Sequence, residues 1–320
     1  MPFRKLTDIF FTLRPVILVP VWGFSIFGYY RATDINPLKL HESWFTISPL
    51  VYAVFLFFSL SVGVVYVMNQ LADIEVDKKN GGLPLIASGI VSAKAAWILC
   101  SICTLLTIVM PLFTQFKLLS LFSFITILIG YVYSFRPFYF SGRLIVDFLS
   151  NATGYGIIAF GVGWYLGGRE LFSVEFLYAS LPYFLLMCAG SINSTIPDID
   201  GDRAEGKNTT AVTLGAPRAH LVSTIILITA GVFALIQKDI LASCCAILSL
   251  PFYFLYIINQ KNIYMEATYK VGGALCMMCA FLVMPVFIPI SLCVFFCTRI
   301  YFRLRHSVEY PSMVPSKTKC

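Results

Sequence analysis

Two short segments of this chain concentrate acidic side chains at the ends of apolar runs. The first contains Asn69, Asp73 and Asp77, which are spaced four residues apart. Because an α-helix has about 3.6 residues per turn, this spacing places three oxygen-bearing side chains along one helix face. Mg²⁺ prefers such oxygen ligands, so the row could bind a hard divalent cation.

The second segment repeats the pattern. Ser194, Asp198 and Asp202 have the same four-residue spacing, and the two segments align as short sequences, DIEVD against DIDGD. Each segment ends an apolar run and precedes a glycine-containing loop. We interpret this as a faint internal repeat of two related helical units, about 1–135 and 136–258.

Acidic residues at helix ends are ordinarily just solvated, and that interpretation suffices for any one of these side chains alone. An aspartate at a helix centre in a bilayer costs about 2.5–3.5 kcal/mol. The doubled spacing on one helix face favours a functional site over solvation. Glu75 and Asp200 fall off the two faces, so we expect them to be solvated.

Composition places both segments in a membrane protein. Of the 320 residues, 58% are apolar and 12% are charged, whereas soluble domains have about 25% charged residues. The chain has too little polar surface to cover a water-facing exterior, which excludes a soluble protein. We predict an all-α, multi-pass integral membrane protein with one membrane domain over residues 1–320. We expect contact with membrane lipid and no nucleic-acid partner.

Nine apolar runs approach the roughly 20 residues that a bilayer span requires. The expected spans are about 9–30, 46–70, 93–115, 118–135, 145–166, 172–196, 219–237, 240–258 and 271–300. The C-terminal helix is expected to cover about 271–305.

The number of spans between the acidic segments predicts that both open on one membrane face. One segment ends the second span and the other ends the sixth. Lysine and arginine are more frequent in the N-terminal segment and the even-numbered loops, which makes that face cytoplasmic. Nine spans put the basic C-terminus, with Arg303 and Arg305, on the opposite face, in disagreement with this orientation.

Two facing rows of carboxylates would repel each other in a low-dielectric site, and a divalent cation relieves that repulsion. One or two carboxylates together with substrate phosphates typically hold Mg²⁺. Nearby lysine and arginine side chains would neutralise the remaining charge of a diphosphate. The sequence therefore predicts a site for Mg²⁺ and a diphosphate carried on a lipid chain. Arg14, inside the first span, is expected either to snorkel to the interface or to contact the diphosphate.

Two CxxC pairs have a different interpretation. Cys100 with Cys103, and Cys276 with Cys279, lie inside apolar runs with no histidines or second pair nearby. Zinc needs four convergent ligands. Packing of small apolar side chains between helices is therefore the better interpretation.

At these residues the chain resembles the UbiA superfamily of intramembrane aromatic prenyltransferases, over nearly its whole length. The resemblance rests on the NxxxDxxxD and DxxxD motifs, on the stretch IPDIDGDR with the following GKNTTAVTLG, and on matches at Arg14-Pro15, Tyr133, Pro137 and Arg143. It implies nine helices in a bundle around a central cavity. It also implies transfer of an isoprenyl group from a polyprenyl diphosphate to a lipid-soluble acceptor.

The resemblance also implies roles for individual residues. Metal binding falls to Asp73, Asp77, Asp198 and Asp202, and proton removal to a carboxylate or to Tyr133. Substrate binding falls to Asn69, Arg14, Lys78, Lys79, Arg143, Ser194 and Lys207. Many members carry an arginine shortly after the first motif, where this chain has Asn80 and two glycines, so Lys78 or Lys79 takes its place. Ser194 replaces an Asp or Asn and contributes no charge.

Three functions stay open on these residues. The first is prenyl transfer to an aromatic ring of lipid-quinone type, because IPDIDGD resembles the quinone and tocopherol branches. The second is a terpene cyclase of the same fold, which uses no acceptor. The third is a cation transporter with intramembrane carboxylates. The sequence defines neither prenyl chain length nor oligomeric state.

Overall fold

A computed structural model describes residues 2–80 and 83–311. These residues form helices and connecting loops, with one isolated bridge between Arg143 and Asn208 and no strand among them. The predicted all-α class is therefore confirmed. The chain divides into two compact units. Of the described residues, unit 1 holds 2–22, 48–80, 83–140 and 291–311, and unit 2 holds 23–47 and 141–290.

The helices of each unit are as follows. Unit 1 contains α1 (Pro2–Thr12), η1 (Pro15–Leu18), α4 (Pro49–Ala72), α5 (Ile74–Asn80), α6 (Pro84–Ala87), α7 (Ala93–Val109), η2 (Met110–Phe113) and α8 (Leu118–Ser134). Unit 2 contains α3 (Leu40–Ser43), α9 (Val146–Ala152), η4 (Thr153–Ala159), α10 (Phe160–Leu166), α11 (Val174–Thr195), η5 (Ile196–Asp198), α12 (Ile199–Ala204), α13 (Thr210–Leu214), α14 (Ala216–Ile236), α15 (Ile240–Asn259) and α16 (Asn262–Phe281). The chain passes between the units within α2 (Val19–Ala32), η3 (Phe140–Gly142) and α17 (Phe287–His306), and also between Ile47 and Ser48.

The nine predicted spans are not confirmed as a count. Seven helical stretches of the described residues are long and apolar enough to cross a bilayer: Arg4–Thr33, Pro49–Ala72, Ala93–Phe113, Val174–Ala204, Ala216–Ile236, Ile240–Asn259 and Phe287–His306. The predicted fourth span forms the shorter apolar helix Leu118–Ser134. The predicted fifth span is not one regular helix, because the π-helical turn η4 separates α9 from α10.

The predicted ninth span, 271–300, is wrong. Its first part ends α16 and its second part begins α17, with a break between Phe281 and Phe287. Pro285 lies in that break, and because proline has no amide hydrogen it cannot continue the hydrogen-bond ladder of a helix. Pro289 lies in the first turn of α17, where proline is tolerated.

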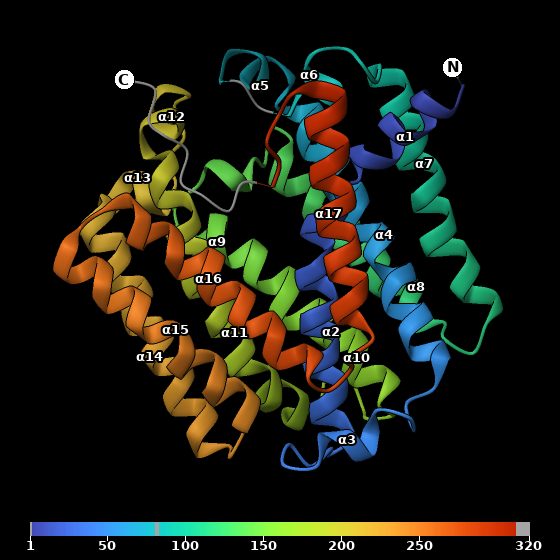
Figure 1. Cartoon of the computed structure of the whole chain (residues 1–320), viewed down its shortest axis with the longest axis vertical. Coiled ribbons are helices and arrows are strands. Elements are labelled where there is room, and N and C mark those ends of the chain that lie inside the picture. Colours follow the sequence, from blue (N-terminus) through green and yellow to red (C-terminus); the bar gives the residue numbers. More distant parts are fainter. Residues whose placement is uncertain (1, 81–82, 312–320) are drawn as a thin grey trace. The chain divides into compact units, whose positions relative to one another are not determined.

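This break removes the disagreement over the basic C-terminus. The guanidinium of Arg305, at the end of α17, lies 2.9 Å from the carboxylate of Asp8 in α1. Both residues belong to unit 1, whose end with α1 also carries α5 and α6 (Figure 1). The basic end of α17 therefore lies with the N-terminal helix and the first acidic segment.

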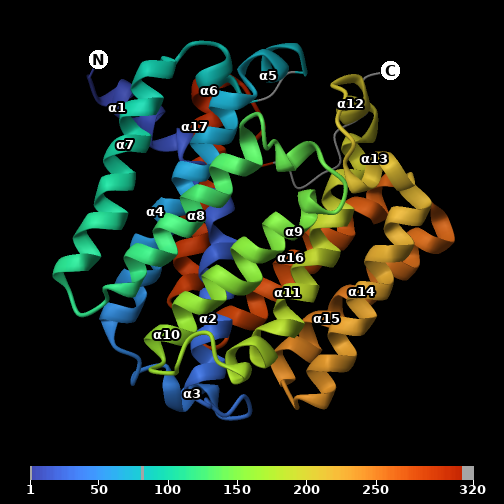
Figure 2. The ribbon, with the colours of Figure 1, turned by 180° about the vertical axis from the view of Figure 1, so that it is seen from behind.

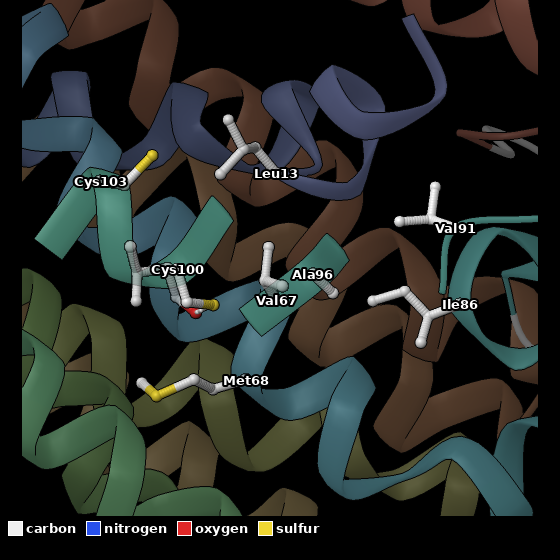
Figure 3. Packing of buried hydrophobic residues seen from close by; sticks show 9 residues of the cluster. Leu13, Val67, Met68, Ile86, Val91, Ala96, Cys100 and Cys103 are labelled. Carbon is white, nitrogen blue, oxygen red and sulfur yellow. Dashed lines mark hydrogen bonds between the residues drawn. The ribbon is translucent and has the colours of Figure 1, made fainter. Parts of the chain in front are cut away.

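The core of unit 1 surrounds one of the CxxC pairs. Figure 3 shows labelled members of a buried apolar cluster in which α4, α6, α7 and the chain after α1 meet: Leu13, Val67, Met68, Ile86, Val91, Ala96, Cys100 and Cys103. In unit 2, Cys276 of α16 packs against α15, where its thiol lies 3.9 Å from the carbonyl oxygen of Cys245. Both sets of thiols fill space between helices, as predicted.

In unit 2, α2 and α10 cross at two glycines. A Cβ built on Gly163 would overlap the carbonyl oxygen of Ser25, and one built on Gly28 would overlap that of Phe160. Small residues allow membrane helices this close an approach, because their backbones can touch. The crossing fixes the first helix of unit 2 against the residues that follow η4.

We expect Gly163→Ala to destabilise unit 2 by about 1–3 kcal/mol, since the added methyl group forces the two backbones apart. The melting temperature of the detergent-solubilised protein, followed by tryptophan fluorescence, measures the effect. Gly154→Ala is the matched control, because a Cβ there meets nothing within 4 Å. Equal melting temperatures for the two variants would contradict the close crossing.

Candidate functional site

The first acidic row is built at the end of α4. The amide of Asp73 donates to the carbonyl of Asn69 at 3.0 Å, and the amide of Asp77 donates to that of Asp73 at 2.8 Å. These four-residue bonds continue the helical register across the bend between α4 and α5. The Asn69 side-chain amide donates to Asp73 Oδ2 at 3.0 Å. Asn69, Asp73 and Asp77 are each half-buried, so the row is accessible from one side.

Two lysines, Lys78 and Lys79, follow this row. Lys78 is exposed and its ammonium lies 2.9 Å from Glu75, which is 78% exposed. An exposed pair of this kind contributes little and does not fix the lysine in place. The side chain of Lys79 lies outside the described part of the chain, as do Gly81 and Gly82.

Tyr133 lies at the same end of unit 1 as this row. Along the chain α7 follows α4 in the opposite direction, so α8 runs in the same direction as α4 (Figure 2). The two helices α4 and α8 pack where Gly130 meets Val65. Three residues further along α8 is Tyr133, about 4.5 Å beyond the contact. The same rise from Val65 leads to Met68, the residue before Asn69. Tyr133 is half-buried there.

The second acidic segment, in unit 2, departs from the predicted helix. Pro197 has no amide hydrogen, and the chain tightens into the 3₁₀ turn η5 between α11 and α12. A 3₁₀ turn has about three residues per turn, so the predicted single α-helical face is interrupted at Asp198. Asp198 is exposed, and the Ser194 hydroxyl donates to the carbonyl of Ser191 at 2.8 Å. Asp200 is fully exposed, as predicted.

Lys207 brings positive charge to this segment. Its ammonium lies 3.0 Å from Asp202 and 2.8 Å from Glu205. The three side chains are largely buried, at 13–17% exposed. The Lys207 amide also donates to the Asp202 carbonyl at 3.0 Å. The chain after α12 is therefore folded back so that lysine faces the carboxylates.

A buried aspartate that the sequence analysis missed holds the neighbouring loop. Asp147, 2% exposed, accepts two hydrogen bonds of 2.7 Å from the amide and hydroxyl of Thr210. The Thr210 hydroxyl in turn accepts from the amide of Ile145 at 2.9 Å. The backbone of Asn208 donates to the carbonyl of Gly142 at 2.9 Å. The signal was available, because an acid inside an otherwise apolar predicted span requires a partner.

These bonds place the loops that carry two predicted substrate-binding residues, Arg143 and Lys207, next to each other. Arg143 forms a parallel bridge with Asn208, the residue after Lys207. The side chain of Arg143 is exposed. Asp147 and Thr210 thus position the loop with Arg143 beside the loop with Lys207, within unit 2.

A further ion pair includes an acid that interacts with Asp198. Glu266 and Lys270 of α16 form an ion pair four residues apart, and Glu266 is 8% exposed. Glu266 is close enough to Asp198 for their charges to interact, and Tyr269 lies near both. The sequence analysis did not select them, although charges in an apolar membrane helix point to a functional role.

Arg14 occupies the break between α1 and η1 in unit 1. Its backbone is left-handed, with φ 53° and ψ 58°. Its side chain is half-buried, and its guanidinium carbon lies 6.0 Å from the ring centre of Tyr66. Its two predicted roles, snorkelling to the interface and contact with the diphosphate, both stay predictions.

The donor atoms of both segments fit Mg²⁺, because they are carboxylate, amide and hydroxyl oxygens. Among the described residues, no three His, Cys, Asp or Glu side chains form a metal-binding group. The usual Mg²⁺ site relies on one or two carboxylates with waters and substrate phosphates. Asp73 with Asp77, and Asp198 with Asp202, lie in different units. That the two pairs of aspartates share one pocket stays a prediction.

Comparison with known proteins supplies the family. The UbiA prenyltransferase family model matches residues 40–269, which include both acidic segments. The chain belongs to the UbiA prenyltransferase family. Family membership and the apolar helices make it an integral membrane protein.

Individual relatives of this UbiA member are more distant. It is 29% identical over 187 residues to a probable chloroplastic homogentisate phytyltransferase 2 of Oryza sativa subsp. japonica, covering 54% of this chain and 47% of that protein. It is 31% identical over 163 residues to digeranylgeranylglyceryl phosphate synthase of Thermococcus kodakarensis, covering 49% of this chain and 54% of that protein. The chain thus matches about half the length of these curated relatives.

A solved structure extends the likeness in fold. The structure of a UbiA homologue from Archaeoglobus fulgidus bound to GPP and Mg²⁺ aligns with a TM-score of 0.64 and 20% identity. The alignment covers 87% of this chain and 99% of that one. The predicted UbiA-like fold is therefore confirmed.

Proposed function

We propose that this UbiA family member is a Mg²⁺-dependent prenyltransferase. It transfers an isoprenyl group from a polyprenyl diphosphate to a lipid-soluble acceptor, an aromatic ring of lipid-quinone type. The observation that carries the proposal is the half-buried row Asn69, Asp73 and Asp77 at the end of an apolar helix. Such a row suits a charged head group attached to a lipid chain.

The residues divide the work of binding. Asp73, Asp77, Asp198 and Asp202 hold the metal, with Asn69 holding Asp73 in place. Bound Mg²⁺ supplies charge stabilisation for the departing diphosphate. Arg143 and Lys207 neutralise the remaining phosphate charge from adjoining loops, together with Arg14, Lys78 and Lys79. Ser194 would hydrogen-bond a water of the bound metal.

The proposed transfer needs no reagent besides the prenyl diphosphate and the acceptor. The allylic C–O bond breaks and its electron pair leaves with the diphosphate. An electron-rich ring carbon of the acceptor then bonds to the allylic carbon and loses its proton. Tyr133 or a carboxylate accepts that proton.

The site is proposed to open to the cytoplasm. The positive-inside bias of the loops supports this side. The position of Arg305 beside Asp8 adds the basic end of α17 to the same side. The names of the curated relatives support both an aromatic and a glycerol-phosphate acceptor. We favour the aromatic acceptor because the stretch IPDIDGD resembles the quinone and tocopherol branches of the family.

Mass spectrometry of lipid products tests the proposal. Purified protein in detergent is incubated with Mg²⁺, a panel of prenyl diphosphates and either aromatic or glycerol-phosphate acceptors. We expect a prenylated aromatic product and equimolar diphosphate, and neither after Mg²⁺ is chelated. Cyclic hydrocarbon without an acceptor would instead establish a terpene cyclase. Cation flux in proteoliposomes without diphosphate release would establish a transporter.

A further inference from the structure

The end of α17 is anchored on α1 within unit 1. The Arg305 guanidinium binds Asp8 through two hydrogen bonds of 2.9 and 3.2 Å, and the Tyr301 hydroxyl donates to the same carboxylate at 2.6 Å. The ring of Tyr301 stacks on Phe11 with centres 3.9 Å apart. Because the Asp8 side chain is only 4% exposed, this contact is largely buried and differs from a surface ion pair.

The anchored helix carries the next residues to Arg14. The chain turns after α17, where the amide of Val308 donates to the carbonyl of Phe302 at 3.3 Å. The ring of Tyr310 then packs edge-on against Phe302, with centres 5.1 Å apart. From there the Tyr310 hydroxyl accepts a 3.3 Å hydrogen bond from Arg14 Nε. The guanidinium carbon of Arg14 lies 5.6 Å from the Tyr310 ring centre.

The chain around Arg14 is also held by α4. The Gln70 side-chain amide donates to the carbonyl of Thr12 at 2.9 Å, and the Tyr66 hydroxyl donates to that of Ile17 at 3.2 Å. These bonds flank the left-handed residue. Such a backbone conformation persists only where the surroundings fix it, and it concentrates at binding sites.

The place of Arg14 relates it to the first acidic row. Tyr66, which lies beside the guanidinium, and Asp73 are seven residues apart, so they occupy the same face of α4. The rise between them is about 10 Å. Arg14 therefore lies along the face that leads to Asp73. Its contact with Tyr310 engages Nε, and the guanidinium has four more N–H groups for bidentate phosphate recognition.

We propose that Tyr310 is a positioning residue that holds the Arg14 guanidinium, which also lies beside Tyr66, for binding of the substrate diphosphate. The segment after α17 is then part of the substrate site, supplied by the chain's own C-terminal region. The proposal rests on the proposed function, in which Arg14 contacts the diphosphate. Arg14 and Tyr310 both lie outside residues 40–269, the part matched by the family model.

A double-mutant cycle on the full chain in detergent tests the proposal. The readouts are the Kd of geranyl diphosphate with Mg²⁺, and kcat and KM for both substrates. Tyr310→Ala is expected to weaken geranyl diphosphate binding about tenfold, with kcat and the acceptor KM within about twofold. Tyr310→Phe keeps the ring and should stay within about threefold of wild type. In an Arg14→Ala background, Tyr310→Ala should add less than about twofold.

Controls separate positioning from folding. Phe296→Ala removes an exposed ring of α17 and should leave the Kd unchanged. Tyr310→Leu keeps apolar volume against Phe302 and replaces Tyr310→Ala if the alanine variant fails to fold. Wild-type affinity in Tyr310→Ala, or additive effects of Tyr310 and Arg14 changes, would overturn the proposal. Diphosphate binding without turnover by wild type would refute the proposed reaction alone, while the cycle in Kd still decides the role of Tyr310.

Discussion

Asp73→Ala and Asp198→Ala are each expected to lower kcat by about 10²- to 10³-fold or more. Both carboxylates are proposed to hold the metal that stabilises the departing diphosphate, and loss of one such electrostatic stabiliser has this magnitude in other enzymes. Asp198 is exposed and Asp73 is half-buried at a helix end, so the fold should tolerate both changes. Product formation by mass spectrometry and melting temperature in detergent measure the two effects.

Each acid has a neighbour that serves as its control. Glu75, 78% exposed, lies two residues from Asp73, and Asp200, fully exposed, lies two residues from Asp198. Alanine at either neighbour should leave turnover within about threefold, because a solvated carboxylate contributes little. Full activity in Asp73→Ala or Asp198→Ala would reject the metal assignment. Equal losses at acid and neighbour would show that net charge, rather than position, matters.

Asp147→Ala has the largest expected effect on stability. It removes the acceptor of two buried hydrogen bonds from Thr210, and each bond to a charged group contributes about 1.5–3 kcal/mol. We expect the free energy of unfolding to fall by about 3–6 kcal/mol. Turnover should also fall, about tenfold, because the loops with Arg143 and Lys207 lose two of the bonds that hold them side by side.

Asp147→Asn supplies the graded comparison. It keeps one acceptor oxygen but presents an amide group to the other donor, so we expect about half of the loss in stability. Denaturation in detergent by a chemical denaturant compares the variants with wild type. Wild-type stability in Asp147→Ala would show that the buried carboxylate does not hold the loops.

Short sequence patterns predicted most of the structure formed by neighbouring residues. The row of Asn69, Asp73 and Asp77 keeps its helical spacing because consecutive backbone hydrogen bonds run through the bend. The same reasoning failed at Asp198, because Pro197 converts the turn to 3₁₀ geometry. The CxxC pairs pack as predicted, since apolar flanks already indicated a core.

Span counting failed where one apolar stretch contains the ends of two helices. Residues 271–300 are mostly apolar, and apolarity alone does not mark where a helix ends. Pro285 was the available signal, but bilayer helices often tolerate proline. The structure shows the break, because one helix ends at Phe281 and the next begins at Phe287.

By itself the sequence determined a helical membrane protein with two acidic motifs, because composition and helical periodicity act over neighbouring residues. Only the tertiary structure decided which distant residues support each motif. Thr210 meets Asp147 across 63 positions, and Tyr310 meets Arg14 across 296. Such partners follow from how whole helices pack, and no periodicity in one segment encodes a contact with another.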